Sequence, residues 1–220
     1  GIFQFESLAY NKISHTQSGV ESILKNTPMH NKTFSYLDDV TNTTKSMKYS
    51  QAFMVAADTS GVSPYHLASR VKQEVVISPT TMSDSVSGTR SGYTGIYNFY
   101  NIGATNTTSG SAVNNGLKWA STGTSYLRPW NSRYRSIVGG AIYIGEKYIN
   151  VGQNTSYLQK FNVTEKNRYN HQYMSNIEAP NSEATKTASA YSATLNEMTL
   201  VFSIPVYTNM PEEVSPIPTK

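Results

Sequence analysis

The feature that most constrains the fold is a long segment of helical periodicity, residues 132–151. Within it, Ile137, Ala141, Ile144 and Tyr148 follow one another at intervals of four, three and four residues. These intervals place the four side chains on one face of an α-helix, which must be buried against other elements. Because the chain of 220 residues contains no cysteine, a packed hydrophobic core without disulfides must hold this helix in place.

Other segments also carry helical signals. Ser63 and Pro64 form a typical N-cap and first-turn proline, and Gly61 is a typical end for the helix before them. Shorter segments show helical spacing of apolar residues without such clear ends. Further helices are predicted over residues 49–59, 63–76, 111–120 and 182–193.

A different pattern interrupts the helices. Residues 78–96 are rich in Ser, Thr and Gly and lack a helical period, which predicts short β-hairpin strands. With the aromatic segment that follows, they form a small β-lobe at about residues 77–103. The fold class is therefore α+β with a mainly helical body. We expect residues 1–46 to form a peripheral helix and loops packed on a main domain of residues 47–200. Residues 201–220 form an extended, Pro-rich tail.

The charge of the chain limits its partners. The net charge is +4 and the pI is about 9.1, but Lys and Arg are scattered, which argues against a nucleic-acid interface and fits an anionic wall polymer better. Only 15% of residues are charged, whereas soluble domains have roughly 25%. Uncharged hydrogen-bonding side chains take their place and suit carbohydrate binding. No apolar run reaches the roughly 18 residues of a membrane span, and the histidines show no metal-site spacing, so we expect no metal and no cofactor.

One acid lies among apolar positions of the helix over residues 63–76. At about 100° per residue, Glu74 lies about 20° from Leu67 and about 60° from Val71. Partial burial there would favour the protonated form of its carboxyl group. A general acid that protonates a glycosidic oxygen needs that form. The alternative is a surface ion pair between Glu74 and Arg70, four residues earlier.

Several segments together resemble the glucosaminidase family of bacterial autolysins, glycoside hydrolase family 73, and in particular its clostridial branch. They are SPYHLASRVKQEV, YNFYNIGA, RSIVGGAIYIGEKYI, GQNTSYLQKFNV and HQYMSN, in this order along residues 1–183. The resemblance implies a lysozyme-like fold with a substrate groove between the helical body and the β-lobe. It also implies a secreted, monomeric enzyme that cleaves peptidoglycan glycan strands after N-acetylglucosamine, with Glu74 as the acid.

The second chemical group is less constrained. Asp84 is the only acid between Glu74 and Glu146, so it is the candidate second carboxylate, with a turn aspartate as the alternative. The substrate's own acetamido group could replace it. The resemblance places Tyr173 near the acid, where its hydroxyl would bond the acid or the attacking water.

Aromatic rings stack on sugar C–H groups, and amides can bond acetamido and hydroxyl groups. Alternation along a strand would point Tyr97 one way and Asn98 and Tyr100 the other. Core packing is the alternative for the aromatic residues. The candidate substrate-binding residues are Tyr97, Asn98, Tyr100, Asn101, Gln172 and Trp130. Two other functions stay open: an N-acetylmuramidase, and a non-catalytic cell-wall-binding module.

Overall fold

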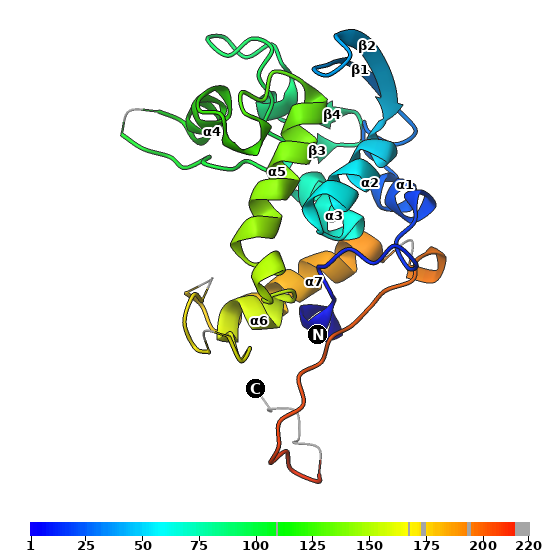
Figure 1. Ribbon diagram of the computed structural model, residues 1–220, viewed down its shortest axis with the longest axis vertical. Helices are drawn as coiled ribbons and strands as arrows, with labels where there is room; N and C mark the ends of the chain where they lie inside the picture. The colour runs from blue at the N-terminus through cyan, green and yellow to red at the C-terminus, as the bar shows by residue number, and fades with distance from the viewer. Residues whose placement is uncertain (109, 167, 173–174, 193–194, 214–220) are drawn as a thin grey trace.

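A computed structural model describes residues 1–108, 110–166, 168–172, 175–192 and 195–213 (Figure 1). Its helices are α1 (Gln17–Leu24), α2 (Tyr49–Ser60), α3 (Pro64–Val75), α4 (Ala112–Ser121), α5 (Arg133–Lys147), α6 (Ser156–Phe161) and α7 (Ala179–Tyr191). Its strands form two antiparallel hairpins, β1 (Thr33–Asp38) with β2 (Thr43–Lys48), and β3 (Val76–Ser78) with β4 (Thr81–Met82). The mainly helical α+β class predicted from the sequence is confirmed.

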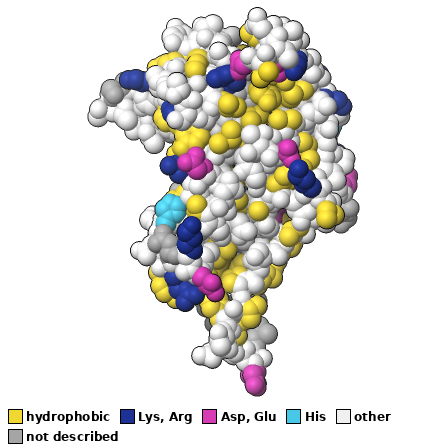
Figure 2. Space-filling view, viewed as in Figure 1, with side chains coloured by type: hydrophobic (Ala, Val, Ile, Leu, Met, Phe, Trp, Pro, Cys, Tyr) yellow, Lys and Arg dark blue, Asp and Glu magenta, His cyan; other side chains and the backbone are white. Residues whose placement is uncertain are grey.

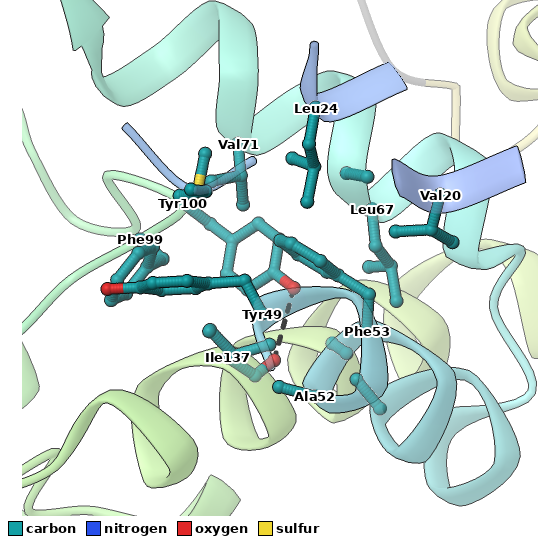
Figure 3. Packing of buried hydrophobic residues seen from close by; sticks show 14 of the residues in the cluster. Val20, Leu24, Tyr49, Ala52, Phe53, Leu67, Val71, Phe99, Tyr100 and Ile137 are labelled. Atoms are coloured by element: carbon teal, nitrogen blue, oxygen red, sulfur yellow. Dashed lines mark hydrogen bonds between the residues drawn. The ribbon is translucent and has the colours of Figure 1, made fainter. Parts of the chain in front are cut away.

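The centre of the molecule is the packing of α2 along α5, with α3 beside them (Figure 1). Buried side chains of these helices, such as Phe53, Leu67 and Ile137, pack against aromatic rings of a loop, such as that of Tyr100 (Figure 3). The hydroxyl of Tyr100 donates to the carbonyl oxygen of Ile137 over 3.1 Å. Glycine in α5 makes this approach possible, because a Cβ at Gly140 would lie 2.2 Å from the Tyr100 ring.

The N-terminal segment is part of this core. Val20, Ile23 and Leu24 of α1 have no exposed surface, and Phe34 and Tyr36 of β1 also point inward. The expectation of a helix and loops over residues 1–46 was therefore wrong for residues 33–46, which belong to the β1–β2 hairpin. The alternating burial of β1 is the physical reason, since every second side chain packs on the body while the others face solvent.

The β-lobe begins directly after α3. Its β3–β4 hairpin is shorter than the sequence suggested, and the residues after it form turns and one turn of 3₁₀-helix, Asp84–Val86. The strand expected at 97–104 is absent from this described stretch, which forms turns. The reason is local: the side-chain oxygen of Asn98 accepts from the backbone N–H of Ile102 over 3.1 Å, which folds the segment back on itself.

The two described ends of the chain pair with each other. The backbone N–H of Ser7 donates to Val201 over 2.7 Å, and that of Ser203 donates to Phe5 over 2.8 Å. Beyond this pairing, the described part of the tail runs away from the body (Figure 1). Within the described residues, no helix combines the length and the apolar character needed to cross a membrane. Charged side chains are few and scattered on the face shown in Figure 2.

Candidate active site

Glu74 lies in the last turn of α3, immediately before the β3–β4 hairpin. Ser63 caps the start of this helix by accepting the backbone N–H of His66 over 3.3 Å, as its sequence predicts. Leu67 and Val71 are fully buried, but Glu74 is exposed. The expected partial burial of Glu74 is therefore wrong. The last turn itself stays packed, since Val75 is only 1% exposed, but two hollows open beside the Glu74 side chain.

Two hollows meet at Glu74. The smaller, about 600 Å³, lies between α3, the loop after Tyr100 and the second half of α5. The larger, about 890 Å³, lies between α3, α6 and α7. Both are lined by His66, Arg70, Glu74 and Gln159. The two hollows therefore adjoin along these side chains; together they are here called the Glu74 groove, and Glu74 lines both of them.

Three residues of α3 face this groove in register. His66, Arg70 and Glu74 are spaced four residues apart, so they form one polar stripe along the helix. Burial, and to a smaller degree the charge of Arg70, lowers the pKa of His66 to about 3, so His66 is neutral at physiological pH. The spacing of this stripe was a readable signal, but the sequence interpretation used Arg70 only as an ion-pair partner.

The ion pair between Arg70 and Glu74 does not form. Both residues are described, and no nitrogen of Arg70 lies within 4.0 Å of the Glu74 carboxylate. The Nε atom of Arg70 is buried and has no hydrogen-bond partner in the described structure. Arg70 is therefore not the partner of the Glu74 carboxylate.

The carboxylate is held by Asn101 instead. The side-chain nitrogen of Asn101 donates to Oε2 of Glu74 over 3.2 Å and to the backbone oxygen of Glu74 over 3.0 Å. Asn101 lines the smaller hollow and belongs to the turn that follows Tyr100. Its amide therefore reaches the groove but is engaged by the acid.

Two residues expected to bind substrate are buried in the core. Asn98 has no exposed surface, and its side-chain nitrogen donates to the carbonyl oxygens of Ile102 and Gly116 over 2.9 and 3.0 Å. Trp130 is also fully buried, and its ring N–H donates to the carbonyl oxygen of Tyr126 over 2.8 Å. Neither side chain is accessible to a glycan, so both expectations are corrected to structural roles.

The two tyrosines of the same segment differ. Tyr100 is 2% exposed and lines the smaller hollow, so it forms a wall of the groove while its hydroxyl is engaged in the core. Tyr97 lines a separate hollow of about 330 Å³, where the guanidinium of Arg133 lies 4.8 Å from its ring centre. The structure thus brings Tyr100, but not Tyr97, to the Glu74 groove.

Asp84 also lies apart from Glu74. It is exposed, it pairs with Arg90 over 3.1 Å, and it lines a hollow that Glu74 does not reach. Among the described residues, the second carboxylate lining the Glu74 groove is Glu183 of α7, which pairs with Lys186 over 2.7 Å. Sequence reasoning missed Glu183 and Gln159 because they come from helices far along the chain, with no local signal.

The last predicted segment contacts a residue of the groove wall through His171. The ring of His171 stacks on Tyr148, which lines the smaller hollow, with ring centres 4.5 Å apart. Gln172 is exposed and its side-chain nitrogen donates to the carbonyl oxygen of Phe161 over 3.2 Å. Tyr173 lies outside the described residues.

In the part of the chain that the structure describes, no three His, Asp or Glu side chains gather as a metal site would require.

Comparison with known proteins identifies related chains. No family model matches this sequence. A bifunctional autolysin of Staphylococcus epidermidis is 32% identical over 111 residues, which cover 50% of this chain but 8% of that protein. The chain thus corresponds to a small part of the curated relatives that it matches.

Solved structures extend the likeness over nearly the whole chain. A major bifunctional autolysin has a TM-score of 0.64 at 22% identity, covering 94% of this chain and 74% of that one. Glucosaminidase B of S. aureus has a TM-score of 0.58 at 24% identity, covering 87% and 65%. Autolysin E of S. aureus, crystallised with the disaccharide NAG-NAM, has a TM-score of 0.53 at 19% identity, covering 87% and 73%. The chain is therefore homologous to a segment of the bifunctional autolysins and has the fold of these autolysin and glucosaminidase structures.

Proposed function

We propose that this chain is a glycoside hydrolase that cleaves peptidoglycan, an endo-β-N-acetylglucosaminidase with Glu74 as its general acid. The observation that carries the proposal is the position of Glu74, an accessible carboxylate that lines both hollows of the Glu74 groove. The fold is that of a protein named glucosaminidase and of an autolysin crystallised with a peptidoglycan disaccharide. Homology to bifunctional autolysins supports the same reaction class.

The groove suits an extended polymer. It is open on both sides of Glu74, so a glycan strand can lie across the carboxylate with sugar rings in each hollow. In the proposed step, the protonated carboxyl group of Glu74 gives its proton to the glycosidic oxygen. The bond between that oxygen and the anomeric carbon breaks, and the leaving sugar departs with a new hydroxyl group.

The group that attacks the anomeric carbon is assigned to the substrate, and water completes the reaction. Asp84 lies outside the groove and Glu183 is paired with Lys186. We therefore propose that the acetamido oxygen of the substrate attacks the anomeric carbon as the glycosidic bond breaks. A water held near Glu74 then adds to that carbon and opens the resulting ring, and its proton returns to the Glu74 carboxylate.

Tyr173 remains the predicted residue near the reacting centre. A Tyr173→Phe variant should keep its melting temperature within about 3 °C and lose activity by roughly tenfold to a hundredfold. Full specific activity with a lowered melting temperature would instead assign the hydroxyl to the scaffold.

The partners and the location follow from the same reaction. Peptidoglycan glycan strands are the proposed substrate, and the net charge of +4 favours additional contacts with anionic wall polymers. We propose that the protein acts outside the cell, at the wall, as a monomer.

The test is the identity of the ends that the protein creates. Purified cell walls are digested, the products are reduced with borohydride, and the soluble muropeptides are examined by mass spectrometry. We expect fragments that end in reduced N-acetylglucosamine. Fragments ending in reduced N-acetylmuramic acid would identify a muramidase, and binding to walls without soluble fragments would identify a non-catalytic module.

A further inference from the structure

One amide group contacts Glu74 at two places. The side-chain nitrogen of Asn101 has two hydrogens, and it lies 3.2 Å from Oε2 and 3.0 Å from the backbone oxygen of Glu74. The backbone oxygen belongs to the last turn of α3, where carbonyl groups have no partner within the helix. Asn101 thus satisfies an orphan carbonyl of α3 and ties the side chain of Glu74 to its own main chain.

This contact also distinguishes the two carboxylate oxygens. Oε2 accepts a hydrogen bond from Asn101, and in a protonated carboxyl group the carbonyl oxygen is a better acceptor than the hydroxyl oxygen, so the amide favours Oε2 as the carbonyl oxygen. The acidic proton is therefore placed on Oε1, which has no hydrogen-bond partner in the described structure. A general acid is effective only when its proton points at the leaving oxygen.

The backbone of Asn101 explains why asparagine suits this position. Its φ is 49°, in the left-handed region. Glycine adopts this region freely, and asparagine and aspartate adopt it more readily than other residues with side chains. Asparagine alone among these three combines a tolerated left-handed backbone with amide hydrogens to donate.

We infer that Asn101 is a positioning residue for Glu74, and that it acts by fixing the carboxylate and directing its proton to Oε1, without binding the glycan. This inference rests on the proposed role of Glu74 and replaces the expectation that Asn101 contacts substrate. A residue that only positions the acid affects the chemical step and leaves substrate affinity unchanged.

The test uses two substitutions that keep the left-handed backbone. Asn101→Gly removes the amide, and Asn101→Asp keeps the shape but loses both donors when ionised. On soluble glycan strands, we expect kcat to fall by about tenfold to a hundredfold in each, part of the roughly 10²–10⁴-fold that a general acid supplies. KM should stay within about twofold. A chito-oligosaccharide should bind the Glu74→Gln variant and the double variant Glu74→Gln with Asn101→Gly equally well, as measured by calorimetry.

The matched control is Asn42→Gly. Asn42 is exposed in the turn of the β1–β2 hairpin and also has a left-handed φ, 51°, so its replacement by glycine should leave kcat and KM unchanged. Wild-type kcat in folded Asn101→Gly and Asn101→Asp variants would overturn the inference, and so would a rise in KM or a loss of chito-oligosaccharide binding. If Glu74→Gln itself kept wild-type turnover, the assignment of the general acid would fail first. An inactive Glu74→Gln beside a fully active Asn101→Gly would refute the role of Asn101 alone.

Discussion

Glu6 and Glu74 are two carboxyl groups of one chain in opposite surroundings. Glu6 is 2% exposed and accepts a hydrogen bond from the hydroxyl of Tyr191 over 3.0 Å. Burial raises the pKa of Glu6 to about 8, and the hydrogen bond from Tyr191 offsets only part of that rise. Glu74 is exposed in the groove and is held by Asn101. The buried, protonated carboxyl that the sequence suggested for the active site thus occurs at Glu6.

The two environments give these carboxyl groups different roles. Glu6 lies where the N-terminal segment meets the tail, in a bridge with Phe202, and no glycan can reach it. Glu74 lies on a polar stripe that opens to both hollows. Burial makes a carboxyl group protonated, but access and orientation make it useful as an acid. The comparison predicts that Glu74 controls activity and that Glu6 controls the pH dependence of stability.

The largest effect is expected from Glu74→Gln. The amide has nearly the same shape but has no acidic proton, so turnover on cell walls should fall by about 10²–10⁴-fold. Because Glu74 is exposed, the melting temperature should stay within about 3 °C. Muropeptide release and thermal unfolding measured on the same preparation check both expectations. A folded variant with wild-type turnover would remove Glu74 from the reaction.

A smaller and different effect is expected from Glu6→Gln. In the folded state Glu6 stays protonated up to about pH 8, whereas in the unfolded chain it ionises above about pH 4.5. Its contribution to stability is therefore present below pH 4.5 and lost as the pH rises toward 8. Glutamine does not ionise, so the variant should gain at least about 3 °C in melting temperature relative to wild type between pH 5 and pH 8.

Glu6→Gln also sharpens the contrast with Glu74. Its turnover per folded molecule should equal that of wild type, because Glu6 lies outside the groove. Parallel melting curves for the two proteins across this pH range would show that Glu6 ionises normally in the fold. A loss of turnover without a loss of folded protein would contradict the separation of the two regions.

The smallest effect is expected from Asp84→Asn. Asp84 is exposed and pairs with Arg90 away from the groove, so turnover should change by less than about twofold. An exposed ion pair contributes about 0–1 kcal/mol to stability. Kinetics on cell walls and thermal unfolding provide the check. A tenfold loss of turnover would mean that the lobe brings Asp84 to the substrate during the reaction.

Local signals predicted the helices well. Ser63 caps α3, and Gly61 ends α2 with a φ of 74°, as their positions in the sequence indicate. The β1–β2 hairpin escaped prediction because β2 is exposed or half-buried throughout and shows no alternation. Only the inward positions of β1 carry a strand pattern, and that pattern is too short to separate from a loop.

The site was predicted in part. The resemblance to the autolysin glucosaminidases and the helix signal located Glu74 at the end of α3, but a helical projection does not show that hollows open beside this position. Asn98 was expected in the groove because amides bond sugar hydroxyl and acetamido groups, and Trp130 because aromatic rings stack on sugars. Their partners, the carbonyl oxygens of Gly116 and Tyr126 among them, become visible only in the fold.

The central claim is that the exposed Glu74 gives its proton to the glycosidic oxygen of a strand lying in the groove. The most direct measurement is a crystal structure of Glu74→Gln with a soluble peptidoglycan glycan fragment. The account predicts sugars in both hollows and a glycosidic oxygen at hydrogen-bond distance, about 2.6–3.2 Å, from the side chain of residue 74. A fragment bound in the groove with every glycosidic oxygen beyond reach of that side chain would contradict it.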